Sequence, residues 1–319
     1  MKYSIIIFLL CASIVAKLRA DSGFVMEGHK GPGEGKHIVF RAADWEYRSE
    51  ECLPMLARIL AERFGFKCTV LFPINAAGEI DPSVNDNVPG LDALDSADLL
   101  VMLTMGLKLP DEQWEHVAQY ANSAKPDVAL RCSLLAGNFD FNPQTKGFAA
   151  QVLGANFGGH YGAHKIESQR GLVDGSNRQH PILRGVRDVW GTTDLYLIKN
   201  FAPDAKVLLH GMGLTGLRSD DPPKRDLALM PLAWVREIPT VNGGSRRVFY
   251  TSMGCGTDFF SEDLRRLVLN GCLWSLNLEA AMGPMTDASI IGHYESPPFG
   301  KDLFRKGRKP LASQPAKKP

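Results

Sequence analysis

Short apolar runs alternate with amphipathic stretches along the first half of the chain. The apolar runs, which predict buried strands, are residues 37–40, 67–72, 97–104 and 127–130. Two stretches between them carry apolar residues at helical spacing and predict helices, one from Ser49 to a stop at Gly65 and one over 110–123. Strands of this kind, alternating with helices, are typical of a parallel sheet covered on both faces. We therefore expect an α/β fold whose ligands bind beyond the carboxyl ends of the strands.

The second half of the chain has a less regular pattern. Residues 139–244 are loop-rich, with a few short strands. Residues 231–238 and 247–252 predict a hairpin, because an Asn-Gly-Gly-Ser turn lies between them. Ser261 is expected to cap a final helix that ends near Asn277.

These changes in pattern set the domain boundaries. We interpret residues 36–280 as one domain with a loop-rich insertion at about 139–244. Residues 281–319 form an extended C-terminal segment, and its end, rich in Lys, Pro and Gly from Lys301 onwards, predicts disorder.

The N-terminus carries the pattern of an export signal. Lys2 is followed by an apolar run over residues 5–16, and the small residue Ala20 precedes Asp21. The run is shorter than the about 20 residues that a membrane-spanning helix needs. We interpret residues 1–20 as a signal peptide, so the mature protein is expected to be exported and to have no stable membrane span. An uncleaved anchor is the alternative.

Composition narrows the partners and the chemistry. A formal net charge of +1 over 319 residues gives no reason to expect nucleic acid as a partner. Removing the signal leaves five cysteines at wide spacings without a C-x-x-C pair, which indicates neither a disulfide framework nor a zinc cluster. A single disulfide stays compatible with export, and the sequence leaves a homo-oligomer open.

The strand at residues 127–130 runs into an abrupt turn, similar to the elbow on which many α/β enzymes mount a nucleophile. This turn offers Arg131 and Cys132 together. A thiol nucleophile needs a histidine to take up its proton. Whether Cys132 has such a partner decides between a Cys-dependent hydrolase and another chemistry.

Two histidines four residues apart form a second candidate site. On a helix, His160 and His164 would share one face, which is a spacing that metal sites use. Glycines precede and separate the two histidines, however, and favour a loop or strand. A divalent metal on His160 and His164 is therefore one interpretation. The other is that His160 acts as a general acid or base without a metal.

Polar and aromatic residues also fall where a ligand is expected. Asp194 and Tyr196 alternate as in a strand, so both side chains can point to one face. Trp45, Glu46 and Arg48 follow the first predicted strand. Trp45 offers a flat apolar surface to a sugar ring, and Glu46 and Arg48 offer hydrogen bonds. The alternatives are structural: a solvated strand face, a core tryptophan and an ion-paired arginine.

Five segments occur in one order along the chain. They are Asp44-Trp-Glu-Tyr-Arg48-Ser-Glu-Glu51, Phe157-Gly-Gly-His160, His180-Pro-Ile-Leu-Arg-Gly-Val186, Asp194-Leu-Tyr196 and Arg247-Val-Phe-Tyr-Thr-Ser-Met-Gly254. Together they resemble the ThuA-like (trehalose-utilisation) family of the class I glutamine amidotransferase-like superfamily, which implies a flavodoxin-like, mainly parallel sheet. Residues 291–300 are similar to a subgroup from bacteria that export such proteins, which implies a periplasmic or extracellular location.

The resemblance also bears on the elbow. An amidotransferase of this superfamily carries its cysteine there and takes a histidine from a later loop. Here the matching elbow position is Arg131, as in the ThuA-like pattern of His or Arg, and His160 matches a family position as well. The loop after Ser252, where the partner histidine is expected, contains none. The resemblance therefore implies that no Cys–His pair is intact.

We therefore expect an exported ThuA-like protein that acts on or binds a carbohydrate or its keto derivative. The catalytic candidates are Arg131 to hold an oxygen anion or carbonyl, His160 as acid or base, and Asp194 to orient it. The substrate-binding candidates are Trp45, Glu46, Arg48 and Tyr196. One alternative is a non-catalytic sugar-binding or assembly module, and another is a Cys-dependent amidohydrolase or peptidase.

Overall fold

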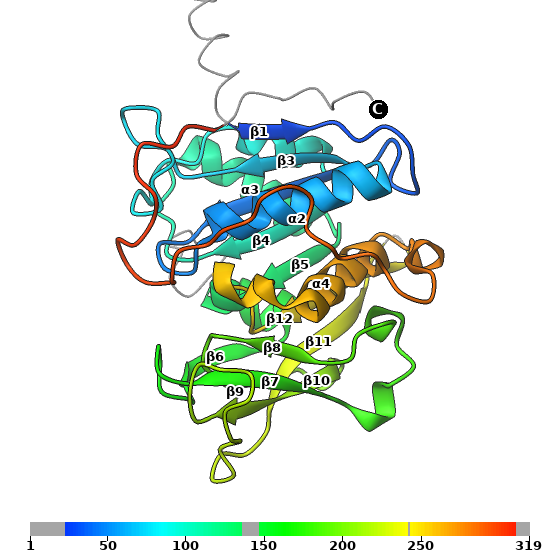
Figure 1. The fold of residues 1–319 in the computed structure, drawn as a ribbon. Helices are drawn as coiled ribbons and strands as arrows, with labels where there is room; N and C mark the ends of the chain where they lie inside the picture. The colour runs from blue at the N-terminus through cyan, green and yellow to red at the C-terminus, as the bar shows by residue number, and fades with distance from the viewer. Residues whose placement is uncertain (1–22, 136–146, 242, 311–319) are drawn as a thin grey trace, which may run out of the picture.

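A computed structural model describes residues 23–135, 147–241 and 243–310. In these ranges ten strands form one sheet in the order β1-β3-β2-β4-β5-β12-β11-β10-β7-β8, and β6 pairs with β9 in a second sheet (Figure 1). The strands are β1 (Gly23–Met26), β2 (His37–Ala43), β3 (Lys67–Leu71), β4 (Leu99–Thr104), β5 (Asp127–Leu130), β6 (Asn156–His160), β7 (Ser168–Val173), β8 (Val189–Gly191), β9 (Tyr196–Lys199), β10 (Lys206–Leu214), β11 (Met230–Pro239) and β12 (Ser245–Thr251).

Five parallel strands, β3-β2-β4-β5-β12, form the centre of the large sheet. Numbered along the chain, they lie in the order 2-1-3-4-5, which is that of flavodoxin-like folds. Every residue of β2, β4 and β5 is buried, as expected of strands that are covered on both faces. The predicted α/β, flavodoxin-like fold is confirmed.

Helices cover both faces of the sheet. α2 (Ser49–Phe64) and α4 (Glu262–Ser275) lie on one face, and α3 (Asp111–Asn122) lies on the other (Figure 1). Alternate residues of β2 divide the core between them, because Phe40 packs on the α2 and α4 side and Val39 on the α3 side. The short helical turns are η1 (Leu91–Ser96), η2 (Arg131–Leu135), η3 (Ala149–Leu153), η4 (Gly175–Asn177), η5 (Pro181–Leu183), η6 (Gly256–Phe260) and η7 (Glu279–Met282).

The loop that leads into α2 is held by Asp44. Its carboxylate accepts hydrogen bonds from the backbone amides of Glu46, Tyr47 and Ser49. At the other end of the helix Gly65 has φ 77°, a left-handed conformation that suits glycine as a helix stop. The helix boundaries predicted from the sequence are therefore confirmed, and Glu46 is fixed at the carboxyl end of β2.

Residues 139–244 contain more strands than their loop-rich pattern predicts. β11, β10, β7 and β8 extend the sheet beyond β12 as antiparallel strands. Glycines inside β7, β8 and β10 explain the difference, because they interrupt the apolar pattern and allow close packing. A Cβ atom at Gly211 would lie 2.4 Å from the Leu195 side chain. Two features of the second half are confirmed: the hairpin of β11 and β12 and the cap of Ser261 on α4.

The C-terminal segment runs back from η7 across α2 (Figure 1). Two backbone hydrogen bonds join it to the rest of the fold, from Ile80 N to Arg308 O (2.7 Å) and from Gly300 N to Glu46 O (2.8 Å). The predicted signal peptide (residues 1–20) and the last residues of the end predicted to be disordered (311–319) lie outside the described residues. Every helix within the described ranges is too short or too polar for a transmembrane span.

Candidate functional site

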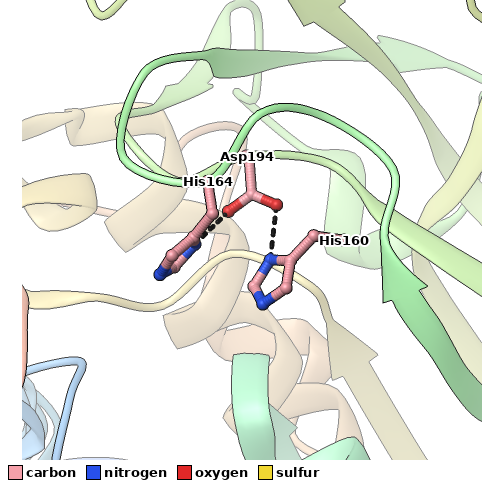
Figure 2. A group of neighbouring side chains, drawn as sticks. All are labelled: His160, His164 and Asp194. Atoms are coloured by element: carbon pink, nitrogen blue, oxygen red, sulfur yellow. Dashed lines mark hydrogen bonds and ion pairs between the residues drawn. The ribbon is translucent and has the colours of Figure 1, made fainter.

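Asp194, just before β9, is the centre of a cluster of charged side chains. Its buried carboxylate has Oδ1 2.8 Å from Arg131 Nη2 and 2.8 Å from His164 Nδ1, and Oδ2 2.7 Å from His160 Nδ1. Figure 2 shows both imidazoles facing the carboxylate. The fold thus brings together the three catalytic candidates, Arg131, His160 and Asp194, and both residues of the candidate metal pair.

Arg131 lies at the elbow after β5, with φ 42°. Such left-handed backbone is uncommon for a residue with a side chain and concentrates at functional sites. The side chain is fully buried, and Nη1 donates to the carbonyl oxygens of Asp194 (2.7 Å) and Ser252 (2.9 Å). With no exposed surface, Arg131 has no access to a ligand oxygen. Its contacts instead fix the position of Asp194.

Two tyrosine rings lie against the Arg131 guanidinium. Its central carbon lies 3.7 Å from the centre of the Tyr196 ring and 5.0 Å from that of Tyr47, distances at which a cation is attracted to an aromatic face. The Tyr196 hydroxyl also donates to the Tyr47 hydroxyl (3.2 Å). Tyr196, a substrate-binding candidate, is therefore buried beneath the cluster and supports Arg131.

His160 is the exposed member of the cluster. It is the last residue of β6 and is paired with Tyr196 of β9, and 36% of its side chain is accessible. Its ring stands edge-on to Phe157 and Tyr196. The Nδ1 atom faces Asp194, and none of the described hydrogen bonds involves Nε2. An imidazole held by a carboxylate at one nitrogen and open at the other is the arrangement of a general acid or base.

His164 lies between two carboxylates. Its Nδ1 atom is 2.8 Å from Asp194 Oδ1 and its Nε2 atom is 2.9 Å from Glu46 Oε1. Burial alone lowers the pKa of His164, but the hydrogen bonds and charges of Asp194 and Glu46 outweigh it and raise the pKa to about 9. Burial likewise opposes ionisation of Asp194, yet His160, His164 and Arg131 hold the pKa of that carboxyl well below its usual range.

The three residues predicted after the first strand take different positions. Glu46 joins the cluster through His164 and through Lys165 Nζ, which lies 3.3 Å from Oε1. Trp45 is half-buried and packs against the core on the α2 side. Arg48 is fully buried, donates to the Trp45 carbonyl oxygen (3.0 Å) and lies 3.6 Å from Glu50. The structure therefore brings Glu46, but not Arg48, to the cluster.

Two residues at the site, Phe299 and Lys165, were not predicted from the sequence. Phe299, in the C-terminal segment, stacks on Tyr47 with ring centres 5.7 Å apart and lies 5.6 Å from the His164 ring. Lys165 has a left-handed backbone, with φ 65°, and its side chain reaches Glu46. Residues 291–300 had entered the resemblance, and that was the one signal that pointed to Phe299.

A second layer of polar groups fixes Asp194 from behind. Gln169 Nε2 donates to the Asp194 carbonyl oxygen (3.1 Å) and to Thr193 Oγ1 (3.1 Å). The buried Asp258 carboxylate accepts from Thr193 N (3.1 Å) and from Thr193 Oγ1 (2.9 Å). Asp258 belongs to the loop after Ser252, where an amidotransferase histidine was expected. In this protein that loop holds the residues around Asp194.

Cys132 has the environment of a packed thiol. It is fully buried, and burial, with the nearby charge of Asp44, raises the pKa of its thiol well above the usual range. None of the described hydrogen bonds pairs its sulfur with an imidazole. The five described cysteines are all unpaired and buried, so none of them presents an exposed thiolate.

A cavity of about 270 Å³ lies between α2 and the C-terminal segment. Glu50, Arg58 and Tyr294 contribute to its wall. None of the predicted site residues lines this cavity, so it is separate from the cluster around Asp194.

Comparisons with known proteins bear on the family. A search of curated proteins finds no match. Among solved structures, a ThuA-like protein from Parabacteroides merdae is 12% identical with a TM-score of 0.46, covering 84% of this chain and 95% of that one. The mmIFT52 N-terminal domain is 14% identical with a TM-score of 0.43, covering 76% and 97%. The ThuA family model, described as trehalose utilisation, matches residues 38–275, and the chain therefore belongs to the ThuA family.

Proposed function

We propose that the protein is an enzyme that transfers a proton on a carbohydrate or its keto derivative, with His160 as the acid–base group. The observation that carries the proposal is the His160–Asp194 pair. Nδ1 of His160 is 2.7 Å from a buried carboxylate oxygen, 36% of the side chain is accessible, and none of the described hydrogen bonds involves Nε2. The carbohydrate as substrate class follows from the description of the family alone.

The charges around Asp194 suit this chemistry. When Nδ1–H of His160 donates to Asp194, Nε2 keeps a lone pair that can accept a proton. The carboxylate then stabilises the imidazolium that forms. Arg131 is ion-paired with Asp194, which keeps the carboxylate ionised and fixes its direction. On a keto sugar, Nε2 would remove a proton from the carbon next to the keto group and return it.

Binding of the sugar is assigned to the exposed surroundings of His160. Lys165, with 48% of its side chain exposed, would hydrogen-bond a hydroxyl group, and the half-buried Trp45 would contact a ring face. Glu46 is buried and would act through Lys165 and His164, which it contacts. Arg48 and Tyr196 are buried, and we give them structural roles. This set is smaller than the one that the sequence predicts.

The test is turnover by a His160→Gln variant. We expect a fall of about 10²–10⁴-fold, measured by NMR as deuterium uptake from D₂O into the keto derivative of trehalose. The control is His116→Gln. His116 of α3 forms a comparable pair with Asp95 of η1, with Nδ1 2.8 Å from Oδ1. Unchanged exchange in His160→Gln would refute the acid–base role. Calorimetric binding of the sugar by wild type without any exchange would favour a non-catalytic sugar-binding module.

Export is proposed on the pattern of residues 2–21 alone. A positive start, an apolar run and a small residue before Asp21 are typical of a cleaved signal. Expressed in a bacterium with a periplasm, the full chain is expected in the periplasmic fraction with Asp21 as its first residue. A chain that lacks residues 2–20 should remain in the cytoplasm. Recovery of the uncleaved full chain from the cytoplasm would contradict the proposal.

A further inference from the structure

We propose that His160, His164 and Asp194 bind one divalent transition-metal ion. The Nδ1 atoms of both histidines face the two carboxylate oxygens, and one ligand atom from each residue lies within 4.8 Å of the others (Figure 2). Two imidazoles and one carboxylate are a donor set with which proteins hold zinc or iron while leaving coordination positions open.

The donors are not yet at zinc spacing, and they depart from it in two ways. Ligand atoms at the usual zinc distances of about 2.0–2.1 Å, placed at tetrahedral angles, stand roughly 3.3 Å apart. The Nδ1–oxygen pairs are now 2.7 Å apart for His160 and 2.8 Å apart for His164. Each of these pairs, which use different carboxylate oxygens, must therefore open by about half an ångström. Donor atoms that stand farther apart, up to the 4.8 Å limit, must move together around the ion. His160 lies at the exposed edge of the cluster and has room to move, whereas Asp194 is fixed by Arg131.

The outer contacts are those of a metal centre. A histidine ligand usually donates its second N–H to a carboxylate, which fixes the ring and its tautomer. His164 has this contact, with Nε2 2.9 Å from Glu46 Oε1, while its Nδ1 atom faces inward. The Glu46 carboxylate is in turn held by Lys165, and the Glu46 backbone carbonyl oxygen accepts from the Gly300 amide.

An ion deepens the proposed function, and its link to turnover rests on that proposal. The ion takes the place of hydrogen on Nδ1 of His160, so the ring carries its hydrogen on Nε2. In that form His160 is the acid of the proposed acid–base chemistry and donates to a substrate oxygen, whereas removal of the carbon proton by Nε2 belongs to the ion-free protein. The open coordination positions suit two adjacent oxygen atoms of a keto sugar.

Calorimetry on the chelator-stripped full chain tests the inference without any sugar. We expect one Zn²⁺ per chain and no binding of Mg²⁺, which prefers oxygen ligands. Glu46→Gln should weaken Zn²⁺ binding about 10–100-fold. His164→Ala should weaken it further, because a ligand is lost, and leaves the His160–Asp194 pair in place. His116→Ala is the control and should bind Zn²⁺ as wild type does.

Two results would overturn the metal site: no Zn²⁺ binding by the stripped protein, or equal binding by wild type and a folded His164→Ala variant. Thermal unfolding of each variant shows that it is folded. The result is independent of the proposed function, because calorimetry needs no substrate. Proton exchange by the stripped protein without any Zn²⁺ binding would refute the ion alone, and Zn²⁺ binding without exchange by either the stripped or the loaded protein would refute the enzyme alone.

Discussion

An Arg131→Met variant is expected to lose about 3 kcal/mol of unfolding free energy, the lower end for breaking a buried ion pair, because Asp194 keeps its contacts with His160 and His164. Arg131 is fully buried and contacts both the carboxylate and the carbonyl oxygen of Asp194. Methionine fills a similar volume between the two tyrosines but satisfies neither oxygen. Urea unfolding at pH 7 measures the difference.

A second buried pair provides the matched control. Arg246 Nε lies 2.7 Å from the buried Asp127 carboxylate, far along β12 and β5 from the elbow. Arg246→Met should therefore lose comparable stability yet keep its turnover per folded molecule, whereas Arg131→Met should lose both. The double variant Arg131→Met/Asp194→Leu, with neither charge, should recover part of the lost stability. Wild-type stability in Arg131→Met would show that the ion pair is not in the interior.

Asp194→Asn is expected to lower turnover by about 10³–10⁴-fold, the scale observed where an aspartate orients a catalytic histidine. The asparagine amide can donate to Nδ1 of His160 and select the tautomer that carries hydrogen on Nε2. The imidazolium also loses its counter-charge. The measurement is the rate of deuterium uptake by the keto sugar, taken under conditions where the variant is folded.

The control for Asp194→Asn is Asp174→Asn. Asp174 accepts from His210 (2.9 Å) at the other end of the antiparallel strands, so it tests the same substitution in a pair remote from the site. We expect its turnover to equal that of wild type. Equal losses in the two variants would mean that the effect of Asp194→Asn is not specific to the cluster.

The parallel half of the fold was predictable from the sequence, because buried parallel strands are continuous apolar runs. β5 and the boundaries of α2 agree with the prediction. The antiparallel extension was harder to predict, since strands such as β7 carry glycine and polar residues that mask the alternation. A local sequence pattern predicts a strand only when one or both faces of the strand are uniformly apolar. Neither face of β7 is uniformly apolar.

Three residues of the cluster were predictable from the sequence, but the hydrogen bonds and ion pairs between them were not. Arg131, His160 and Asp194 were selected from family positions and from the ends of strands, and they meet although Arg131 and Asp194 are 63 residues apart. Whether each of the other candidates can reach a ligand depends on its burial in the fold. The spacing of residues along the sequence does not encode that burial. Arg48 and Tyr196, for example, were predicted to bind the substrate, yet both side chains are buried in the interior. Phe299 depends on the path of the C-terminal segment over the fold.

The proposed chemistry requires His160 and Asp194 to act as one unit. A double-mutant cycle on the rate of proton exchange measures the coupling between the two residues directly. Groups that act together are strongly non-additive, so removing the second costs little once the first is gone. We predict that His160→Gln/Asp194→Asn exchanges at about the rate of the slower single variant. Losses that multiply, giving a double variant slower than either by the full product, would contradict the account.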